Sequence, residues 1–377
     1  MNKEALHTPC FILNSNELKA NYRAFSAALS RHFPSHVLAY SVKTNSNPFL
    51  LKVLLEEGAA AEVVSDTEYA LAGAMGFKRL IYNGPVKEKE SFLAALEEGA
   101  LVNIDSHQEL SWLQDLPSGK NYGVGLRVNV SLEEDQTFSR FGFDRAGLVQ
   151  AMAAIDKLPN VQLKGLHLHR TSKSRSLEVY RSISRQASEL IQRYDLKLDY
   201  LDIGGGFFGD FPGKPTYEDY VSALAENLPP HLTLIVEPGN ALAASAFSFQ
   251  ISIVDVKNIG NERVAVCDGS RNDVDPLFRK TDYFKRFPTV EEGRPKVKRQ
   301  TVVGATCLEN DRLFVMENGP ELREGDRVEF CNVGAYTMAL SPLFIRYFPR
   351  VYIREGEEYR LASEQWQAKD YLNAYGV

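Results

Sequence analysis

The sequence lacks most features that would place a protein outside the ordinary globular class. Only four of its 377 residues are cysteines, Cys10, Cys267, Cys307 and Cys331, and none has the spacing of a CxxC pair or a Cys/His metal site. Scattered cysteines of this kind fit reduced thiols and predict neither a disulfide framework nor a bound metal. The N-terminal stretch MNKEALHTPC has no apolar core of a signal peptide. No apolar run approaches the ~18 residues that cross a bilayer. We therefore expect a cytoplasmic protein.

The chain also lacks an excess of positive charge. Its net charge is -6, with 24% charged and 44% hydrophobic residues. This balance argues against general nucleic-acid binding and leaves a small-molecule partner open. The hydrophobic fraction is sufficient for a substantial core, and the length favours one large domain with one smaller domain.

A long alternation of strand-like and helix-like segments is the strongest architectural pattern. Seven amphipathic helical patterns, several of them ending in glycine, separate eight strand-like runs. Eight strands over ~210 residues favour a (β/α)8 barrel over an open doubly wound sheet, which usually has fewer strands. An eighth helix is expected at AASAFSF, residues 243–249, or merged with the exit from the barrel. The strand-like runs begin near His36, Ala60, Leu80, Leu101, Tyr122, Leu163, Leu198 and Leu232.

After about Ala246 the pattern becomes mainly β, with short strand-like runs separated by NG, GN, GD and EG turns. The early run PCFIL, residues 9–13, needs a sheet to join, and this later sheet is available. We therefore predict a barrel domain over residues 27–246 and a β-rich domain made of residues 1–26 and 247–377.

Polar residues gather where the predicted strands end. Active sites of (β/α)8 barrels lie at the carboxyl ends of the strands. In this chain those positions include an amine, an imidazole, a run of three glycines and a carboxylate, so we expect them to converge on one face. The strand-end residues are Lys43, Ser65, Asn83, Asp105, Arg127, Asn129, His169, Gly204, Gly205, Gly206 and Glu237.

Each of these features alone has an ordinary structural reading. Lys43, with small neighbours in LAYSVKTN, could reach solvent or form a Schiff base with a carbonyl cofactor. The glycine run in LDIGGGF fits a tight turn or a backbone phosphate site. Glu237 in VEPGN could be a salt-bridged barrel residue, or could face a pyridine nitrogen and keep the ring an electron sink.

Taken in order, these motifs resemble the pyridoxal-phosphate-dependent decarboxylases of the alanine-racemase-like barrel fold, the group of ornithine, arginine and diaminopimelate decarboxylases. The resemblance spans nearly the whole chain. It rests on YSVKTN, GLHLHRTS, LDIGGGF, VEPGN, GATCLEND and VGAYT.

The resemblance implies a cofactor, pyridoxal 5'-phosphate, and a set of site residues. Lys43, His169, Glu237 and Cys307 are the implied catalytic residues, and Cys307 is implied to act across a homodimer interface with shared sites. An amino acid is the implied small-molecule substrate. The cofactor-binding residues implied beside these are Arg127, Ser172, Gly204, Gly205, Gly206 and Tyr336, and the substrate-binding residues are Arg170, Leu308 and Asp311.

Four departures from the family pattern concern mainly substrate recognition. Leu308 stands where the family usually has an acidic residue that binds the distal amino group of a basic substrate. Asn240 replaces an arginine, Arg170 begins a loop that gains Lys173 and Arg175, and Asp275 lies near an arginine position of diaminopimelate decarboxylases.

These departures predict decarboxylation of a non-standard or conjugated L- or D-amino acid in a specialised pathway, such as that of a siderophore or peptide antibiotic. Two alternatives stay open. One is an amino-acid racemase of the same fold, although racemases place an arginine where this chain has Glu237. The other is a non-catalytic homologue with a regulatory or binding role.

Overall fold

The computed structural model describes residues 6–132, 139–170, 173–209 and 211–377. The chain forms two compact units, which we call the barrel unit, residues 19–242, and the sheet unit, residues 1–18 with 243–377. Among the described residues, no helix combines the length and the apolar character that crossing a membrane requires.

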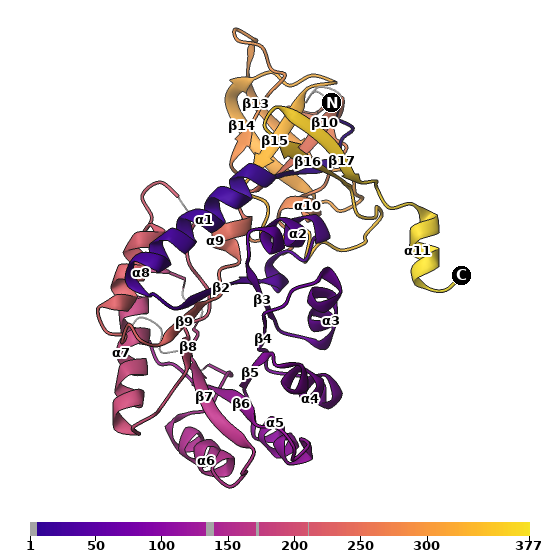
Figure 1. The fold of residues 1–377 in the computed structure, drawn as a ribbon. Coiled ribbons are helices and arrows are strands. Elements are labelled where there is room, and N and C mark those ends of the chain that lie inside the picture. The colour runs from indigo at the N-terminus through magenta and orange to yellow at the C-terminus, as the bar shows by residue number, and fades with distance from the viewer. Residues whose placement is uncertain (1–5, 133–138, 171–172, 210) are drawn as a thin grey trace. The chain divides into compact units, whose positions relative to one another are not determined.

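The barrel unit is built on eight parallel strands, β2 to β9, that close into a barrel. This confirms the predicted fold class, and each strand begins within two residues of its predicted start. Figure 1 shows the helices α2 to α8 outside the ring of strands. The strands are β2 His36–Ser41, β3 Ala60–Val63, β4 Leu80–Tyr82, β5 Leu101–Ile104, β6 Tyr122–Arg127, β7 Val161–His167, β8 Tyr200–Asp202 and β9 Thr233–Val236.

The helices begin and end at the signals that the sequence carries. Ser65 caps α3 by accepting a hydrogen bond from Glu68 N, and the left-handed Gly76 ends the same helix. Thr216 and Asp219 form a capping box at the start of α8. The helices of this part are α1 Ser15–His32, α2 Pro48–Glu56, α3 Asp66–Met75, α4 Lys89–Glu98, α5 His107–Trp112, α6 Arg145–Ile155, α7 Leu177–Arg193, α8 Tyr217–Ala225 and α9 Asn240–Ala243.

The lower interior of the barrel is apolar. Val37, Ala39, Ala60, Ile81, Tyr200 and Ile235 form one buried cluster. Polar side chains appear towards the carboxyl ends of the strands, where Glu62, Asn83, Asn103, Asp202 and Glu237 are all buried. The barrel interior therefore has an apolar part and, towards the carboxyl ends of the strands, a polar part.

The expected eighth helix at residues 243–249 is wrong in position. The helix there, α9, occupies Asn240–Ala243, and the strand β10 already begins at Phe247. The reason is pairing: Phe247 and Phe249 align with Leu13 and Phe11 of β1 Cys10–Asn14. Apolar residues that fit a helix are drawn into the sheet by these partners.

The sheet unit contains a nine-stranded sheet in which β1 lies inside, antiparallel to β10 and parallel to β16. Cys10, Ile12, Tyr352 and Tyr359 pack with Leu6 in its core. The early PCFIL run thus joins the later strands, as expected. The other elements are β10 Phe247–Ile259, β11 Glu262–Cys267, α10 Arg271–Val274, β12 Lys285–Arg286, β13 Lys296–Val303, β14 Arg312–Pro320, β15 Arg327–Cys331, β16 Arg350–Glu355, β17 Glu358–Ser363 and α11 Ala368–Ala374.

Candidate active site

Lys43 lies just beyond the carboxyl end of β2. The strand ends at Ser41, and residues Val42–Thr44 form one 3-10 turn, closed by a hydrogen bond of 3.1 Å from Asn45 N to Val42 O. The Lys43 side chain is 42% exposed, and its Nζ lies 2.7 Å from Glu62 Oε2. Its amine is therefore accessible to a ligand while it is held by a buried partner.

Glu62, on β3, is the partner that the sequence analysis missed. Its side chain is only 1% exposed and also accepts a hydrogen bond of 2.6 Å from Ser41 Oγ. Burial alone raises the pKa of Glu62, but the charge and hydrogen bond of Lys43 and the bond from Ser41 bring the pKa below its ordinary value. Glu62 is thus a carboxylate facing the Lys43 ammonium. An acid within the apolar run AAEVV was the available signal.

His169 follows β7 and presents a neutral ring. Burial, with the charges of Arg127 and Lys43, lowers the pKa of His169 to about 3. Its Nδ1 is buried and has no hydrogen-bond partner among the described residues. A Cβ added to Gly204 would come within 2.5 Å of the ring, so the glycine packs directly against it. The ring of His169 therefore packs against Gly204 and is uncharged.

The glycine run forms the turn after β8. Gly204 and Gly206 have φ values of +71° and +93°, which favour glycine. A Cβ on Gly205 would lie 2.3 Å from Glu237 O, so that position also excludes a side chain. Glu237 N donates to Gly204 O at 2.8 Å, which fixes the turn to the end of β9. The turn is a rigid stretch of backbone without side chains.

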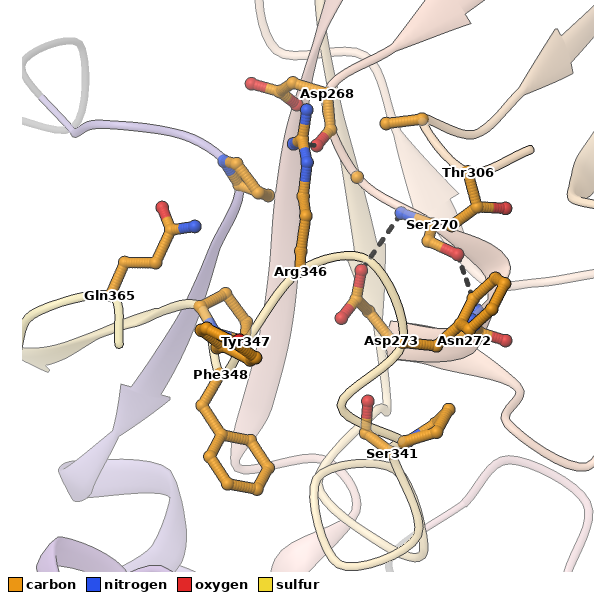
Figure 2. A pocket seen from close by; sticks show the side chains of 16 residues that line it. Asp268, Ser270, Asn272, Asp273, Thr306, Ser341, Arg346, Tyr347, Phe348 and Gln365 are labelled. Atoms are coloured by element: carbon orange, nitrogen blue, oxygen red, sulfur yellow. Dashed lines mark hydrogen bonds between the residues drawn. The ribbon is translucent and has the colours of Figure 1, made fainter. Parts of the chain in front are cut away.

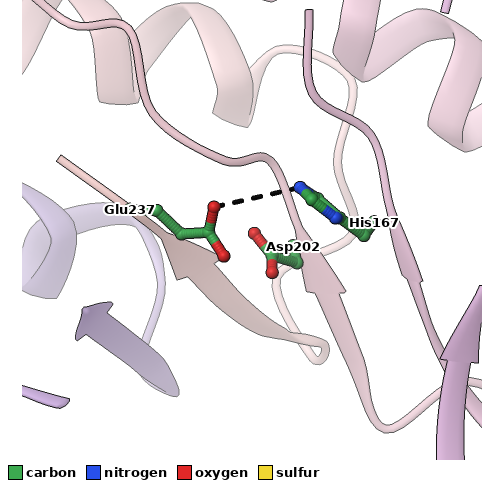
Figure 3. Close-up of side chains that lie close together, drawn as sticks. All are labelled: His167, Asp202 and Glu237. Atoms are coloured by element: carbon green, nitrogen blue, oxygen red, sulfur yellow. Dashed lines mark ion pairs between the residues drawn. The ribbon is translucent and has the colours of Figure 1, made fainter. Parts of the chain in front are cut away.

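Glu237 shares its surroundings with Asp202 and His167, as Figure 3 shows. The three ligand atoms lie within 4.8 Å of one another, and His167 Nε2 is 3.9 Å from Glu237 Oε2. Burial, with the neighbouring carboxylates of Asp202 and Glu62, raises the pKa of Glu237 well above its ordinary value. Burial likewise raises the pKa of Asp202 to about 6. The raised pKa values of the two carboxyl groups favour a proton on this pair.

Two amides connect these acids and were not assigned a role from the sequence. Asn83 Nδ2 donates to Glu237 Oε1 at 2.6 Å and to Glu62 Oε1 at 3.3 Å. Asn103 Nδ2 donates to Asn83 Oδ1 at 2.8 Å and to Asp202 Oδ2 at 3.1 Å. The acids around Lys43 and those near Glu237 therefore belong to one hydrogen-bonded network.

Arg127 lies at the end of β6, and Arg170 lies just after β7. Arg127 forms an ion pair of 2.9 Å with Asp105, and its buried Nε has no hydrogen-bond partner among the described residues. Arg170 Nη1 donates to Val130 O at 3.2 Å. Ser172, expected to contact a phosphate, lies outside the described residues.

Cys307, Leu308 and Asp311 belong to the sheet unit, in the turn between β13 and β14. Asp311 is buried and accepts hydrogen bonds from Arg271 N at 2.7 Å and from Thr306 Oγ1 at 2.5 Å. These bonds hold the turn, while Cys307 is exposed and Leu308 is 38% exposed. Both line a groove of about 730 Å³ with the faces of β11 and β13. The substrate-binding role of Asp311 stays a prediction. The contacts that Asp311 makes in the structure organise the turn.

A second cleft of the sheet unit is drawn in Figure 2. It is bounded by residues 268–273, 305–306 and 341–349. Asp273 accepts from Ser270 N at 3.0 Å, and burial raises the pKa of Asp273 to about 7. Arg346 Nη1 donates to the backbone oxygen of Asp268. The cleft combines one cation with two acids.

Asp275 and Tyr336 both belong to the sheet unit. Asp275 Oδ2 accepts from Arg271 Nη2 at 2.9 Å and from Lys280 N at 2.9 Å, so its carboxylate already has partners. Tyr336 has a φ of +56° and is 43% exposed. A tyrosine in this left-handed conformation is uncommon and points to a local constraint.

Comparisons with known proteins agree on one family. The family model described as "Pyridoxal-dependent decarboxylase, pyridoxal binding domain" matches residues 16–244. A diaminopimelate decarboxylase of Aquifex aeolicus is 29% identical, with 89% of this chain and 83% of the relative covered. The "L-glutamyl-[BtrI acyl-carrier protein] decarboxylase" of Niallia circulans is 26% identical, covering 89% and 86%.

Solved structures show the same fold. The crystal structure of an Aquifex aeolicus protein has a TM-score of 0.85 at 26% identity, covering 99% of this chain and 93% of that one. The diaminopimelate decarboxylase of Helicobacter pylori, complexed with L-lysine, has a TM-score of 0.85 at 21% identity, covering 99% and 98%.

Proposed function

Because the chain belongs to the family of pyridoxal-dependent decarboxylases, we propose that it removes the α-carboxylate of a non-standard or conjugated amino acid. The observation that carries the reaction type is that a partly exposed Lys43 and a buried Glu237, whose pKa is raised, follow strands at the same end of one barrel. The observation that carries the substrate class is Leu308, which is exposed and offers no charge to a distal ammonium.

The residues of the barrel unit fit pyridoxal phosphate. The buried His169 Nδ1 and Arg127 Nε have no hydrogen-bond partner in the described part of the chain, as expected of atoms that bind a ligand. The turn of Gly204, Gly205 and Gly206 has no side chains of its own, which suits a phosphate. We assign the ring face to His169, the ring nitrogen to Glu237 and the aldehyde to Lys43. Ser172 and Tyr336 remain the proposed additional phosphate contacts.

The protein's own groups then have separate tasks. Pyridoxal phosphate, when bound, supplies an aldehyde and a ring that accepts the electrons left by departing carbon dioxide. Lys43 Nζ holds the aldehyde and must first lose its proton, for which Glu62 Oε2 is 2.7 Å away. Glu237 brings a proton to the ring nitrogen. Cys307, contributed by a second copy of the chain, returns a proton to the α-carbon.

The proposed substrate differs from the small basic amino acids that the family usually takes. Leu308 deprives a distal ammonium of the acidic partner that the family has at this position, and the lost interaction costs roughly 1–3 kcal/mol. The Niallia circulans relative acts on a glutamyl group carried by a protein, so a conjugated substrate occurs among similar chains. Arg170, Lys173 and Arg175 are the proposed contacts for an anionic part of such a conjugate.

A decarboxylation screen tests this proposal. Carbon dioxide release is measured with ornithine, lysine, arginine, diaminopimelate and glutamate as free amino acids. Diaminopimelate and glutamate are also tested as pantetheine thioesters of the distal carboxyl group, which leave the α-carboxylate free to react. We expect the best thioester to exceed its free amino acid at least about tenfold in kcat/KM, which corresponds to about 1.4 kcal/mol. Ordinary rates with a free amino acid and none with conjugates would contradict the substrate class. Exchange of the α-proton without carbon dioxide release would indicate a racemase instead.

The variant Lys43→Ala tests whether the site acts on a cofactor at all. Purified wild type, reconstituted with pyridoxal phosphate, should show the visible absorbance band of the bound cofactor. The Lys43→Ala variant should lack this band, and its activity should be reduced at least about a hundredfold. Lys52→Ala, on the surface of α2, is the matched control and should keep both. A wild type without the band after reconstitution would favour the non-catalytic alternative.

A further inference from the structure

Asn83 lies between two buried carboxyl groups and donates a hydrogen bond to each of them. The side chain is 3% exposed, with one Nδ2 shared between Glu237 Oε1 at 2.6 Å and Glu62 Oε1 at 3.3 Å. Its Oδ1 accepts from Asn103 Nδ2 at 2.8 Å. Since Asn103 can only donate through Nδ2, this bond fixes which end of the Asn83 amide faces the acids.

The two carboxyl groups are in opposite charge states. Glu62 faces the Lys43 ammonium at 2.7 Å and also accepts from Ser41 Oγ, so it is a carboxylate. Among the described residues, the basic group within ion-pair distance of Glu237 is His167, whose pKa burial lowers well below its ordinary value, and Glu237 also stands beside Asp202. Burial therefore favours a proton on the Asp202–Glu237 pair. Asn83 is the group that donates to a carboxyl on each side.

A donor shared in this way makes the two sides dependent on each other. The two N–H groups belong to one nitrogen, so a stronger bond on one side weakens donation on the other. Asn83 donates a hydrogen bond to Glu62, and Glu62 accepts one from Lys43 Nζ, the atom that reacts with an aldehyde. A change of charge at Glu237 can thus reach Lys43 through Asn83 and Glu62.

We propose that Asn83 is a positioning residue that couples the charge of Glu237 to the protonation of Lys43. When Glu237 passes its proton to a ring nitrogen, its carboxylate accepts a stronger hydrogen bond from Asn83. The hydrogen bond from Asn83 to Glu62 then becomes weaker. Glu62 Oε2 then takes a proton from Lys43 Nζ across 2.7 Å. One N–H bond breaks and one O–H bond forms, leaving a neutral amine and a neutral acid. Docking of the ring nitrogen thereby prepares the amine.

The inference rests on the proposed roles of Lys43 and Glu237, and its test needs no substrate. The full chain without cofactor is acetylated with trace acetic anhydride from pH 6 to 11, and peptide mass spectrometry gives the pH at which Lys43 is half reactive. Glu237→Gln keeps residue 237 neutral at every pH, whereas Glu237 becomes a carboxylate as the pH rises, so the variant should raise this midpoint by about half a pH unit or more. In the background Asn83→Leu, the same Glu237→Gln change should shift it by less than half as much.

A second probe reports on the cofactor itself. Pyridoxal phosphate is added to the same four proteins, the product is trapped with borohydride, and intact mass gives the fraction attached at each pH. Its midpoint should move in parallel with the acetylation midpoint. Asn227→Leu is the matched control, because the Asn227 amide donates to Ser184 Oγ at 3.1 Å and to neither Glu62 nor Glu237, and it should keep the full response to Glu237→Gln.

Equal shifts in the wild-type and Asn83→Leu backgrounds overturn the coupling, since Asn83 would then only fill space. If Asn83→Leu does not fold, Asn83→Ser gives the same cycle, because one short hydroxyl cannot donate to both acids. A chain that decarboxylates nothing in the substrate screen can still show the coupling, and an active decarboxylase can lack it. The two proposals therefore fail separately.

Discussion

The neutral state of His169 has a measurable consequence for stability. Its folded pKa of about 3 lies below the ordinary 6.5, so between these values the unfolded chain binds a proton that the folded chain does not. Stability from this residue is therefore lost as the pH falls below 6.5. Relative to His169→Gln, the cofactor-free wild type should lose about 2 kcal/mol of unfolding free energy between pH 7.5 and pH 5.

Urea unfolding of both proteins at the two pH values checks this prediction. The comparison with His169→Gln matters because Asp202 and Glu237, whose pKa values are raised, add the opposite pH dependence to both proteins. Unfolding free energies that change in parallel with pH would mean that His169 is protonated in the folded state.

Residues differ in how far the sequence alone predicts them. Lys43 and Glu237 were predicted because each stands at the end of an apolar run within a recognisable motif. Glu62 and Asn83 were missed as site residues because their importance comes from partners on neighbouring strands. The pairing of Ser41 with Glu62 follows from the register of β2 and β3, and local sequence does not specify register. A network across strands is therefore visible only in the folded barrel.

The turn after β8 gives a prediction at the scale of an element. Gly205→Ala puts a Cβ 2.3 Å from Glu237 O, so the ends of β8 and β9 must separate. We expect a loss of about 1–3 kcal/mol in stability and a loss of at least about tenfold in pyridoxal phosphate affinity. Fluorescence titration and urea unfolding measure the two effects.

Gly73→Ala, in the helix α3, is the matched control for the turn. A Cβ there meets nothing within 4 Å, and alanine is the better helix former by about 0.5–1 kcal/mol. Stability should rise slightly and cofactor affinity should stay unchanged. A Gly205→Ala protein that binds the cofactor normally would show that the turn can move without cost to the site.

Elements of the barrel followed the sequence more closely than those beyond it. The eight strand starts were predicted because the βα alternation fixes type and order together. The expected eighth helix failed because Phe247 and Phe249 find partners in β1, far away in sequence. The two-residue strand β12 has too little sequence to carry any pattern and exists through its pairing with β15.

At the scale of the whole molecule, the proposed homodimer with shared sites can be tested by mixing inactive variants. If Lys43 and Cys307 act in one site but come from different copies, a mixed dimer of Lys43→Ala and Cys307→Ala has one intact site. Random exchange at equal amounts should restore about a quarter of wild-type activity. Activity assays after mixing, with size-exclusion chromatography, check this.

Two controls accompany the mixing experiment. Lys43→Ala mixed with Glu237→Gln should recover nothing, because both residues belong to the barrel unit of one chain. Recovery in that mixture, or none with Cys307→Ala, would contradict a site shared between copies.

The interior position of β1 also bears on how the chain folds. Residues 10–14 lead the sequence, yet they pair with Phe247–Gln250 on one side and Arg350–Arg354 on the other. During synthesis the first strand must wait for residues 247–250 before its first partner exists, and for residues 350–354 before its second, while the βα units between can already pack. Closing so long a loop is slow. The nascent N-terminal strand is therefore the segment for which a chaperone has most time to act.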